Sequence, residues 1–134
     1  MTAKQWLNRG RHIDQEIAEL ENSRKRITER LTSITQNYDS DGAQATKDPH
    51  KFDRLAEIDG QISERADELI RIKAEIFATI NRLPDRRQRM VLHSYYIDGK
   101  TWEQTAVDLS YSWRQVMRIH GHALKEIEVL IKMA

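Results

Sequence analysis

The segment 102–121 constrains this chain more than any other part of its sequence. Its spacing matches the helix-turn-helix motif, in which two short helices meet at a fixed angle. A small residue, Ala106, lies midway along the first helix, where a larger side chain would push the second helix away. Ser110 follows at the turn position that usually carries glycine, so the turn must tolerate a side chain there. The sequence therefore predicts helices at about 102–109 and 113–131.

Two local signals mark the starts of these helices. Thr101 is followed three residues later by Gln104, and Ser112 is followed in the same way by Gln115. In such pairs the hydroxyl accepts a hydrogen bond from the third helical N–H, and the amide side chain reaches back to the cap. We therefore expect Thr101 and Ser112 to be N-caps. A unit of this kind places the start of its second helix in the major groove of DNA.

The start of the predicted second helix has a polar outer face. Arginine side chains match the base edge of guanine and glutamine side chains match that of adenine. A solvated helix face is the ordinary alternative, but the surrounding motif favours contact with bases or phosphates. The expected DNA contacts are Lys100, Thr101, Ser112, Trp113, Arg114, Gln115, Met117 and Arg118. The opposite stripe, Val116, Ile119, Ala123, Leu124 and Ile127, is expected in the core.

Aromatic residues near the motif allow two interpretations. Trp113 has the position to meet a thymine methyl group or a sugar, or to pack on Tyr111 or the first helix, and we favour packing. Trp102 and Tyr95 or Tyr96 fit a hydrophobic core better than a stacking platform for bases.

Histidines and arginines of the same region are weighed as ligands. His120 and His122 are two residues apart, which puts them on different faces of a helix, so no metal site is expected. For these residues and for His93 we expect contact with solvent or phosphate instead. Possible phosphate or protein-partner contacts are Arg82, Arg86, Arg87, Arg89 and His122.

Residues upstream extend the match to a known family. The segments are Ile80–Pro84, Arg86, Arg89, Met90–Leu92, Tyr95–Ile97, Asp98–Thr101 and Ala123–Leu124. With the helix-turn-helix they resemble the fourth conserved region of bacterial sigma factors, over roughly residues 80–130. The resemblance implies a helix opened by Leu-Pro, a glycine turn and a helix-turn-helix that reads the −35 promoter element. The sigma regions that read the −10 element have no counterpart. A helical hairpin before such a domain resembles small phage and prophage regulators of the ArpU/RinA type.

Hydrophobic residues recur every seven positions over residues 4–38 and again over residues 49–81. In the first segment one heptad position is occupied by Trp6, Ile13, Leu20, Ile27 and Ile34. The second is occupied by Gly10, Ile17, Arg24, Leu31 and Tyr38. In the second segment the two positions are occupied by Leu55, Ile62, Leu69, Ile76 and Leu83, and by Ile58, Arg65 and Ile72. In each segment the two heptad positions form one apolar stripe along a long helix, which we call the seam. A partner helix is needed to cover this seam.

Residues 39–48 are turn formers without periodicity and predict a loop, after which Asp48–Pro49 suits a helix start. Two helices of similar length around one loop predict an antiparallel hairpin. One hairpin cannot bury all these aliphatic side chains, so a third helix or a second chain is expected. We therefore predict an all-α protein with a hairpin domain at 1–79. A helix-turn-helix domain follows at 80–134, with a first helix at about 86–97.

Composition limits the alternatives. The chain has 134 residues, no cysteine, and no apolar run approaching a membrane helix, which takes ~20 residues. No signal peptide opens it, so we expect a cytoplasmic protein of a bacterial host cell, without a membrane partner. Residues 1–79 carry 13 Lys/Arg and 15 Asp/Glu, whereas residues 80–134 carry 9 and 6. The C-terminal part is thus mildly basic, which is compatible with phosphate contact.

These features predict a sequence-specific transcription regulator of phage or prophage origin that binds double-stranded DNA. We expect a homo-oligomer, with a dimer favoured, and contact with RNA polymerase stays open. The alternatives are a phage DNA-packaging adaptor similar to a small terminase subunit, and a helical protein-interaction module. No catalytic constellation, phosphate loop or calcium loop stands out, so we expect neither an enzyme nor a cofactor.

Overall fold

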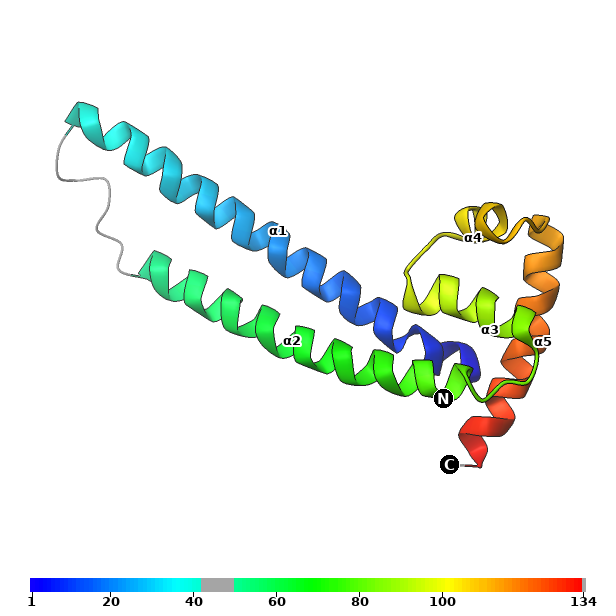
Figure 1. The fold of residues 1–134 in the computed structure, drawn as a ribbon. Coiled ribbons are helices and arrows are strands. Elements are labelled where there is room, and N and C mark those ends of the chain that lie inside the picture. Colours follow the sequence, from blue (N-terminus) through cyan, green and yellow to red (C-terminus); the bar gives the residue numbers. More distant parts are fainter. Residues whose placement is uncertain (42–49, 134) are drawn as a thin grey trace. The chain divides into compact units, whose positions relative to one another are not determined.

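The computed structural model is all-helical, as predicted (Figure 1). It describes the backbone of residues 1–41 and 50–133, and the side chains of residues 1–32, 50 and 52–133. Two long helices come first, and the shorter helices follow. The elements are α1 (Ala3–Asp41), α2 (His50–Ile80), α3 (Arg86–Leu92), the π-helical turn η1 (His93–Ile97), α4 (Trp102–Leu109) and α5 (Trp113–Lys132). Within the described residues there is no strand.

The helix bounds agree closely with the seven-residue pattern and the capping signals. The first helix reaches Asp41, three residues beyond its predicted end, while α4 begins and ends as predicted. The predicted loop at 39–48 falls mostly on residues 42–49, and the Asp48–Pro49 helix start falls entirely there. Both therefore lie outside the described residues.

The helix predicted at 86–97 ends in a π-helical turn. The N–H of Asp98 donates to the carbonyl of His93 over 3.0 Å, which is a hydrogen bond across five residues instead of four. The chain then leaves the helix through Gly99, whose φ of 71° suits a residue without a Cβ. Single π turns often occur at functional positions in helices.

Contacts divide the described chain into two compact units, each of which takes part of the long helices. The tip unit comprises Ile13–Glu68 and is an antiparallel pair formed by α1 and α2. Both seam arginines bridge the two helices there. Arg24 bonds Asp59 at 2.5 Å, and Arg65 lies 3.0 Å from Glu16. The seam arginines thus hold the pairing in register through exposed ion pairs, which contribute more to specificity than to stability.

The helix-turn-helix unit comprises Met1–His12 and Leu69–Ala134. Its core joins the ends of the long helices to α3, η1 and α5, which cover the seam residues Ile76 and Leu83. The buried cluster consists of Ala3, Leu7, Ile76, Ile80, Leu83, Leu92, Tyr96, Ala123 and Ile127. The division therefore falls inside α1 and α2 and does not coincide with the boundary expected at residue 79.

In the part of the chain that the structure describes, no helix has the length and apolar character needed to cross a membrane.

Candidate nucleic-acid interface

The turn between α4 and α5 takes the conformation that the motif requires. Ser110 has φ 58° and ψ 37°, which is the left-handed region that glycine usually occupies. The N–H of Tyr111 donates to the carbonyl of Ala106 over 3.0 Å, which closes the end of α4. Serine at this position carries a conformational cost, and the surrounding hydrogen bonds hold it there. The prediction of a turn that tolerates a side chain is confirmed.

Both predicted N-caps are present. Ser112 and Gln115 form the full reciprocal box, with N–H···O distances of 3.1 Å and 2.8 Å. The hydroxyl of Thr101 accepts from the N–H of Gln104 at 3.0 Å, which is the first half of such a box. The Gln104 amide does not reach back. It donates to Asp108 at 2.7 Å instead, because a residue four positions along the helix lies on the same face.

The packing of α4 on α5 fixes the angle of the motif. Ala106 is 8% exposed and lies in a small core with Val91 and Val116. Trp102, Leu109, Tyr111, Met117 and Ile119 pack around this core. The expected core stripe of α5 is confirmed, with Val116, Ala123 and Ile127 buried and Ile119 and Leu124 half-buried. Met117 was expected on the outer face, but its half-buried side chain contributes to packing.

The outer face of the first turns of α5 presents two arginines. Arg114 and Arg118 are both exposed and lie one turn apart, and their side chains make no hydrogen bond or ion pair with any residue that the structure describes. Trp113 beside them is 58% exposed, so the expectation that it packs on Tyr111 or the first helix is wrong. The first turn contains no acidic residue, and helix N-termini favour anions. This surface combines positive charge with an aromatic ring.

Other predicted contact residues serve the local structure. Ser112 and Gln115 are exposed, but both are engaged in the capping box. Lys100 lies 2.7 Å from Asp108, and this hydrogen bond raises the pKa of the lysine and lowers that of the aspartate. Contact of these residues and Thr101 with DNA stays a prediction.

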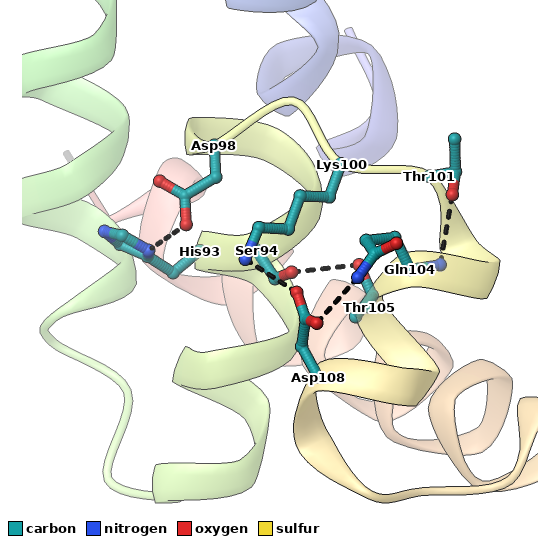
Figure 2. Close-up of polar contacts among 8 residues, drawn as sticks. All are labelled: His93, Ser94, Asp98, Lys100, Thr101, Gln104, Thr105 and Asp108. Atoms are coloured by element: carbon teal, nitrogen blue, oxygen red, sulfur yellow. Dashed lines mark hydrogen bonds and ion pairs between the residues drawn. The ribbon is translucent and has the colours of Figure 1, made fainter.

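Polar contacts join η1 and its following loop to α4 (Figure 2). The hydroxyls of Ser94 and Thr105 lie 3.0 Å apart and are buried. The imidazole of His93 lies 3.4 Å from Asp98. A cavity of about 320 Å³ lies beside them and is lined by Asn81, Arg89, Met90, His93, Ser94, Asp98, Lys100, Asp108 and Leu109. Asp108 was not among the residues predicted from the sequence, although its spacing of four from Gln104 on one helix indicates that the two side chains share a face.

The arginines before and within α3 divide into two pairs. Arg89 donates to the carbonyls of Leu83 and Pro84 at 2.6 Å and 3.0 Å, so it anchors the chain entering α3. Arg87 lies 3.7 Å from Asp85, the N-cap of α3. Arg82 and Arg86 are exposed, as is His122 on α5. Phosphate or partner contacts of these residues stay a prediction, and Arg89 has the least freedom for one.

A buried pair of polar aromatic residues, Tyr96 and His120, joins η1 to α5. His120 is 8% exposed, and its Nε2 lies 2.7 Å from the hydroxyl of Tyr96. The expectation that His120 contacts solvent or phosphate is therefore wrong. Trp102 packs against His120, and Tyr95 stacks on Trp102 with ring centroids 3.7 Å apart. The expected core role of these aromatic residues is confirmed. Among the described residues no cluster of metal-ligating side chains occurs.

Acid is expected to destabilise the protein through this histidine. Burial, with a smaller contribution from Lys4, lowers the pKa of His120 to about 4 from an ordinary value of 6.5. The folded state therefore disfavours the charged ring, and stability falls as pH drops from about 6.5 towards 4. The full difference in pKa corresponds to about 3 kcal/mol. Urea denaturation between pH 8 and 4 measures it.

The variant His120→Asn serves as the control for this pH dependence, because asparagine keeps a hydrogen-bonding partner for Tyr96 but does not titrate. Carboxylates titrate in both proteins, so the difference between them isolates the histidine. Parallel curves for the two proteins between pH 6.5 and 4 would contradict the assignment.

Comparison with known proteins places the chain in a family. No curated protein and no solved structure matches it. A family model matches residues 39–128, which is about two thirds of the chain and includes all of α2, α3, η1 and α4 and most of α5. The chain therefore belongs to the family described as Protein of unknown function (DUF1492).

Proposed function

We propose that this protein is a sequence-specific DNA-binding transcription regulator that reads the major groove with the start of α5. The observation that carries the proposal is the exposed pair Arg114 and Arg118, without partners among the described residues, on a helix whose start is fixed by the turn at Ser110. Arginine forks bind guanine edges in two hydrogen bonds. The turn at Ser110 holds the helix that carries these side chains in one orientation, as base recognition needs.

The resemblance of residues 80–130 to the fourth conserved region of sigma factors supports the same function. The resemblance favours a role in transcription, and the likeness to ArpU/RinA regulators favours an origin in a phage or prophage. Double-stranded DNA is its partner, and RNA polymerase is a further candidate. One helix-turn-helix rarely provides enough affinity alone, so a homo-oligomer binding two half-sites suits this function. It acts in the cytoplasm of the bacterial host and needs no cofactor.

The exposed Trp113 extends this surface. Its ring has apolar area to bury against a thymine methyl group or a sugar, whereas a ring packed inside the motif would not. Gln115, whose Oε1 accepts from the N–H of Ser112, has its amide oriented by the capping box. Together with the two arginines these side chains form the proposed reading surface.

Selection of genomic fragments followed by sequencing identifies the DNA site. On that site Arg114→Ala and Arg118→Ala are each expected to weaken specific binding by about 1–3 kcal/mol, because each removes a base contact. Binding to random duplex at low salt should change much less. Fluorescence anisotropy on both duplexes measures the difference.

Arg54→Ala is the matched control, since it removes the same charge from an exposed position of α2 in the tip unit. Its affinity for the selected site should stay close to that of the unaltered protein. Equal losses on selected and random duplexes for both α5 variants would show that they contact phosphate only. Failure to select any site would refute the proposed function.

A further inference from the structure

A glycine lies on the exposed side of α5, near the middle of the helix. Gly121 is across the helix from the buried Ala123, which follows two residues later. A glycine inside a helix is destabilising relative to alanine, because glycine loses more conformational freedom on folding. Its presence at such a position therefore needs a physical reason.

Two other glycines of the chain have a reason within the fold. Gly99 adopts a positive φ, and a Cβ on Gly10 would lie 3.6 Å from the side chain of Lys73 on α2. Gly121 is part of a regular helix. Apart from its chain neighbours and the adjoining backbone of α5, no heavy atom of the described residues lies within 4 Å of the place of its Cβ. The fold therefore leaves open space beside Gly121.

Positive charge surrounds this open position. Four exposed residues share one face of α5, because they follow one another at spacings of four, three and four. They are Arg114, Arg118, Gly121 and Lys125, and we call them the Arg114–Lys125 face. The side chain of Lys125, like those of the two arginines, makes no hydrogen bond or ion pair within the described part of the chain. This face can therefore bind an anion without first breaking an ion pair.

The positive face has a sharp end. Residues 113–125 include no aspartate or glutamate, and the exposed Glu126 and Glu128 follow directly. Carboxylates repel phosphate, and like charges placed together weaken association. A DNA duplex laid along α5 therefore matches the charge of the helix only as far as Lys125.

The dimensions of a DNA groove agree with this length. An α-helix rises roughly 1.5 Å per residue, which puts Gly121 about 10 Å and Lys125 about 16 Å from Arg114 along the axis. The major groove is about 12 Å wide. A helix that contacts bases at Arg114 therefore reaches the phosphates at the border of the groove near Gly121 and Lys125.

We propose that the sugar-phosphate backbone at the edge of the major groove passes over Gly121 and that Lys125 binds one of its phosphates. The absence of a Cβ lets the backbone come close to α5, and the ammonium one turn further along supplies the charge. This contact rests on the proposed function and adds to it. Phosphate contacts position a protein on the duplex and carry no sequence information, so the second half of α5 differs in role from Arg114 and Arg118.

Substitution of Gly121 separates stability from DNA binding. Gly121→Ala should raise the folding equilibrium constant by about fivefold, because alanine favours the helix. The same variant should bind DNA more weakly, and Gly121→Leu should lose about tenfold or more in affinity because the larger side chain overfills the contact. Since phosphates are alike in every sequence, the losses should be equal on selected and random duplexes. Urea denaturation and fluorescence anisotropy measure the two effects.

Gly60→Ala and Gly60→Leu are the matched controls. Gly60 is an exposed glycine of α2 in the tip unit, and it also has open space beside it. It lies away from the Arg114–Lys125 face in the sequence and belongs to the other unit. The controls should gain stability in the same way and keep the DNA affinity of the unaltered protein.

The salt dependence of binding tests Lys125. Lys125→Gln should make the plot of log affinity against log salt concentration shallower by about one, because one phosphate contact is lost. Lys132→Gln removes the same charge from the same helix beyond the acidic boundary, where Lys132 lies 3.5 Å from Glu128. This control should leave the slope unchanged.

Three results would overturn the proposed backbone contact and leave the proposed function standing. They are unchanged affinity in Gly121→Leu, an unchanged salt slope in Lys125→Gln, and a loss confined to the selected duplex. A fall in stability in Gly121→Ala would also overturn it, since the side chain would then meet the protein itself. If the unaltered chain bound no duplex at low salt, the proposed function and this contact would both be refuted.

Discussion

Leucine in place of Ala106 is expected to abolish DNA binding. Ala106 is almost fully buried between Val91 and Val116, and its carbonyl accepts the hydrogen bond that closes α4. Three added carbons cannot fit there without moving α5, and such overpacking costs about 1–3 kcal/mol. The expected outcome is a helical protein whose affinity for the selected site falls to that for random duplex. Fluorescence anisotropy and circular dichroism together measure it.

The adjacent substitution Val107→Leu is the matched control for Ala106→Leu. Val107 is largely exposed on the same helix, so a larger side chain meets solvent there. Its DNA affinity and its unfolding free energy should both stay near those of the unaltered protein. Unchanged DNA affinity in Ala106→Leu would contradict the use of this motif for DNA binding.

Truncation of Leu7 to alanine is expected to destabilise the helix-turn-helix unit, although it lies far away in the sequence. Leu7 is fully buried with Ile76, Ile80 and Ile127. Removing a buried leucine side chain and leaving a cavity costs about 2–5 kcal/mol. The midpoint of urea denaturation should fall accordingly, and DNA binding should disappear at temperatures at which the unaltered protein still binds.

His12→Ala is the control, because His12 is exposed on the same helix and close in sequence. It should leave the denaturation midpoint nearly unchanged. A loss of stability in Leu7→Ala no larger than in His12→Ala would contradict the assignment of the first turns of α1 to this unit.

A second contact between α1 and the motif also indicates that the helix-turn-helix unit depends on the first turns of α1. The guanidinium of Arg11 donates to the carbonyl of Tyr95 at 3.0 Å and lies 4.1 Å from the centroid of its ring. Tyr95 in turn stacks on Trp102 at the start of α4. The first turns of α1 thus support the helix that carries Ala106. A fragment beginning at residue 80 would lack Ala3, Leu7, Ile76 and their contacts.

The sequence determined the helices and their local ends. The spacing of Ala106 and Ser110, the capping pairs at Thr101 and Ser112, and the seven-residue columns predicted helix bounds that the structure reproduces within a few residues. These features depend on hydrogen bonds and side-chain contacts between residues at most four apart, or on which face of a helix must be covered. Such information is present in the order of the residues.

The tertiary structure alone decided which of these side chains are exposed. The histidine at position 120 was expected to be exposed and is buried, whereas the tryptophan at position 113 was expected to pack and is exposed. Burial depends on which residues from distant parts of the chain pack against a side chain. Tyr96, a long way back along the chain, supplies a hydrogen-bonding partner that makes a buried imidazole tolerable. In the same way, the inclusion of Leu7 in the helix-turn-helix unit follows from long-range packing of α1. No local periodicity contains that information.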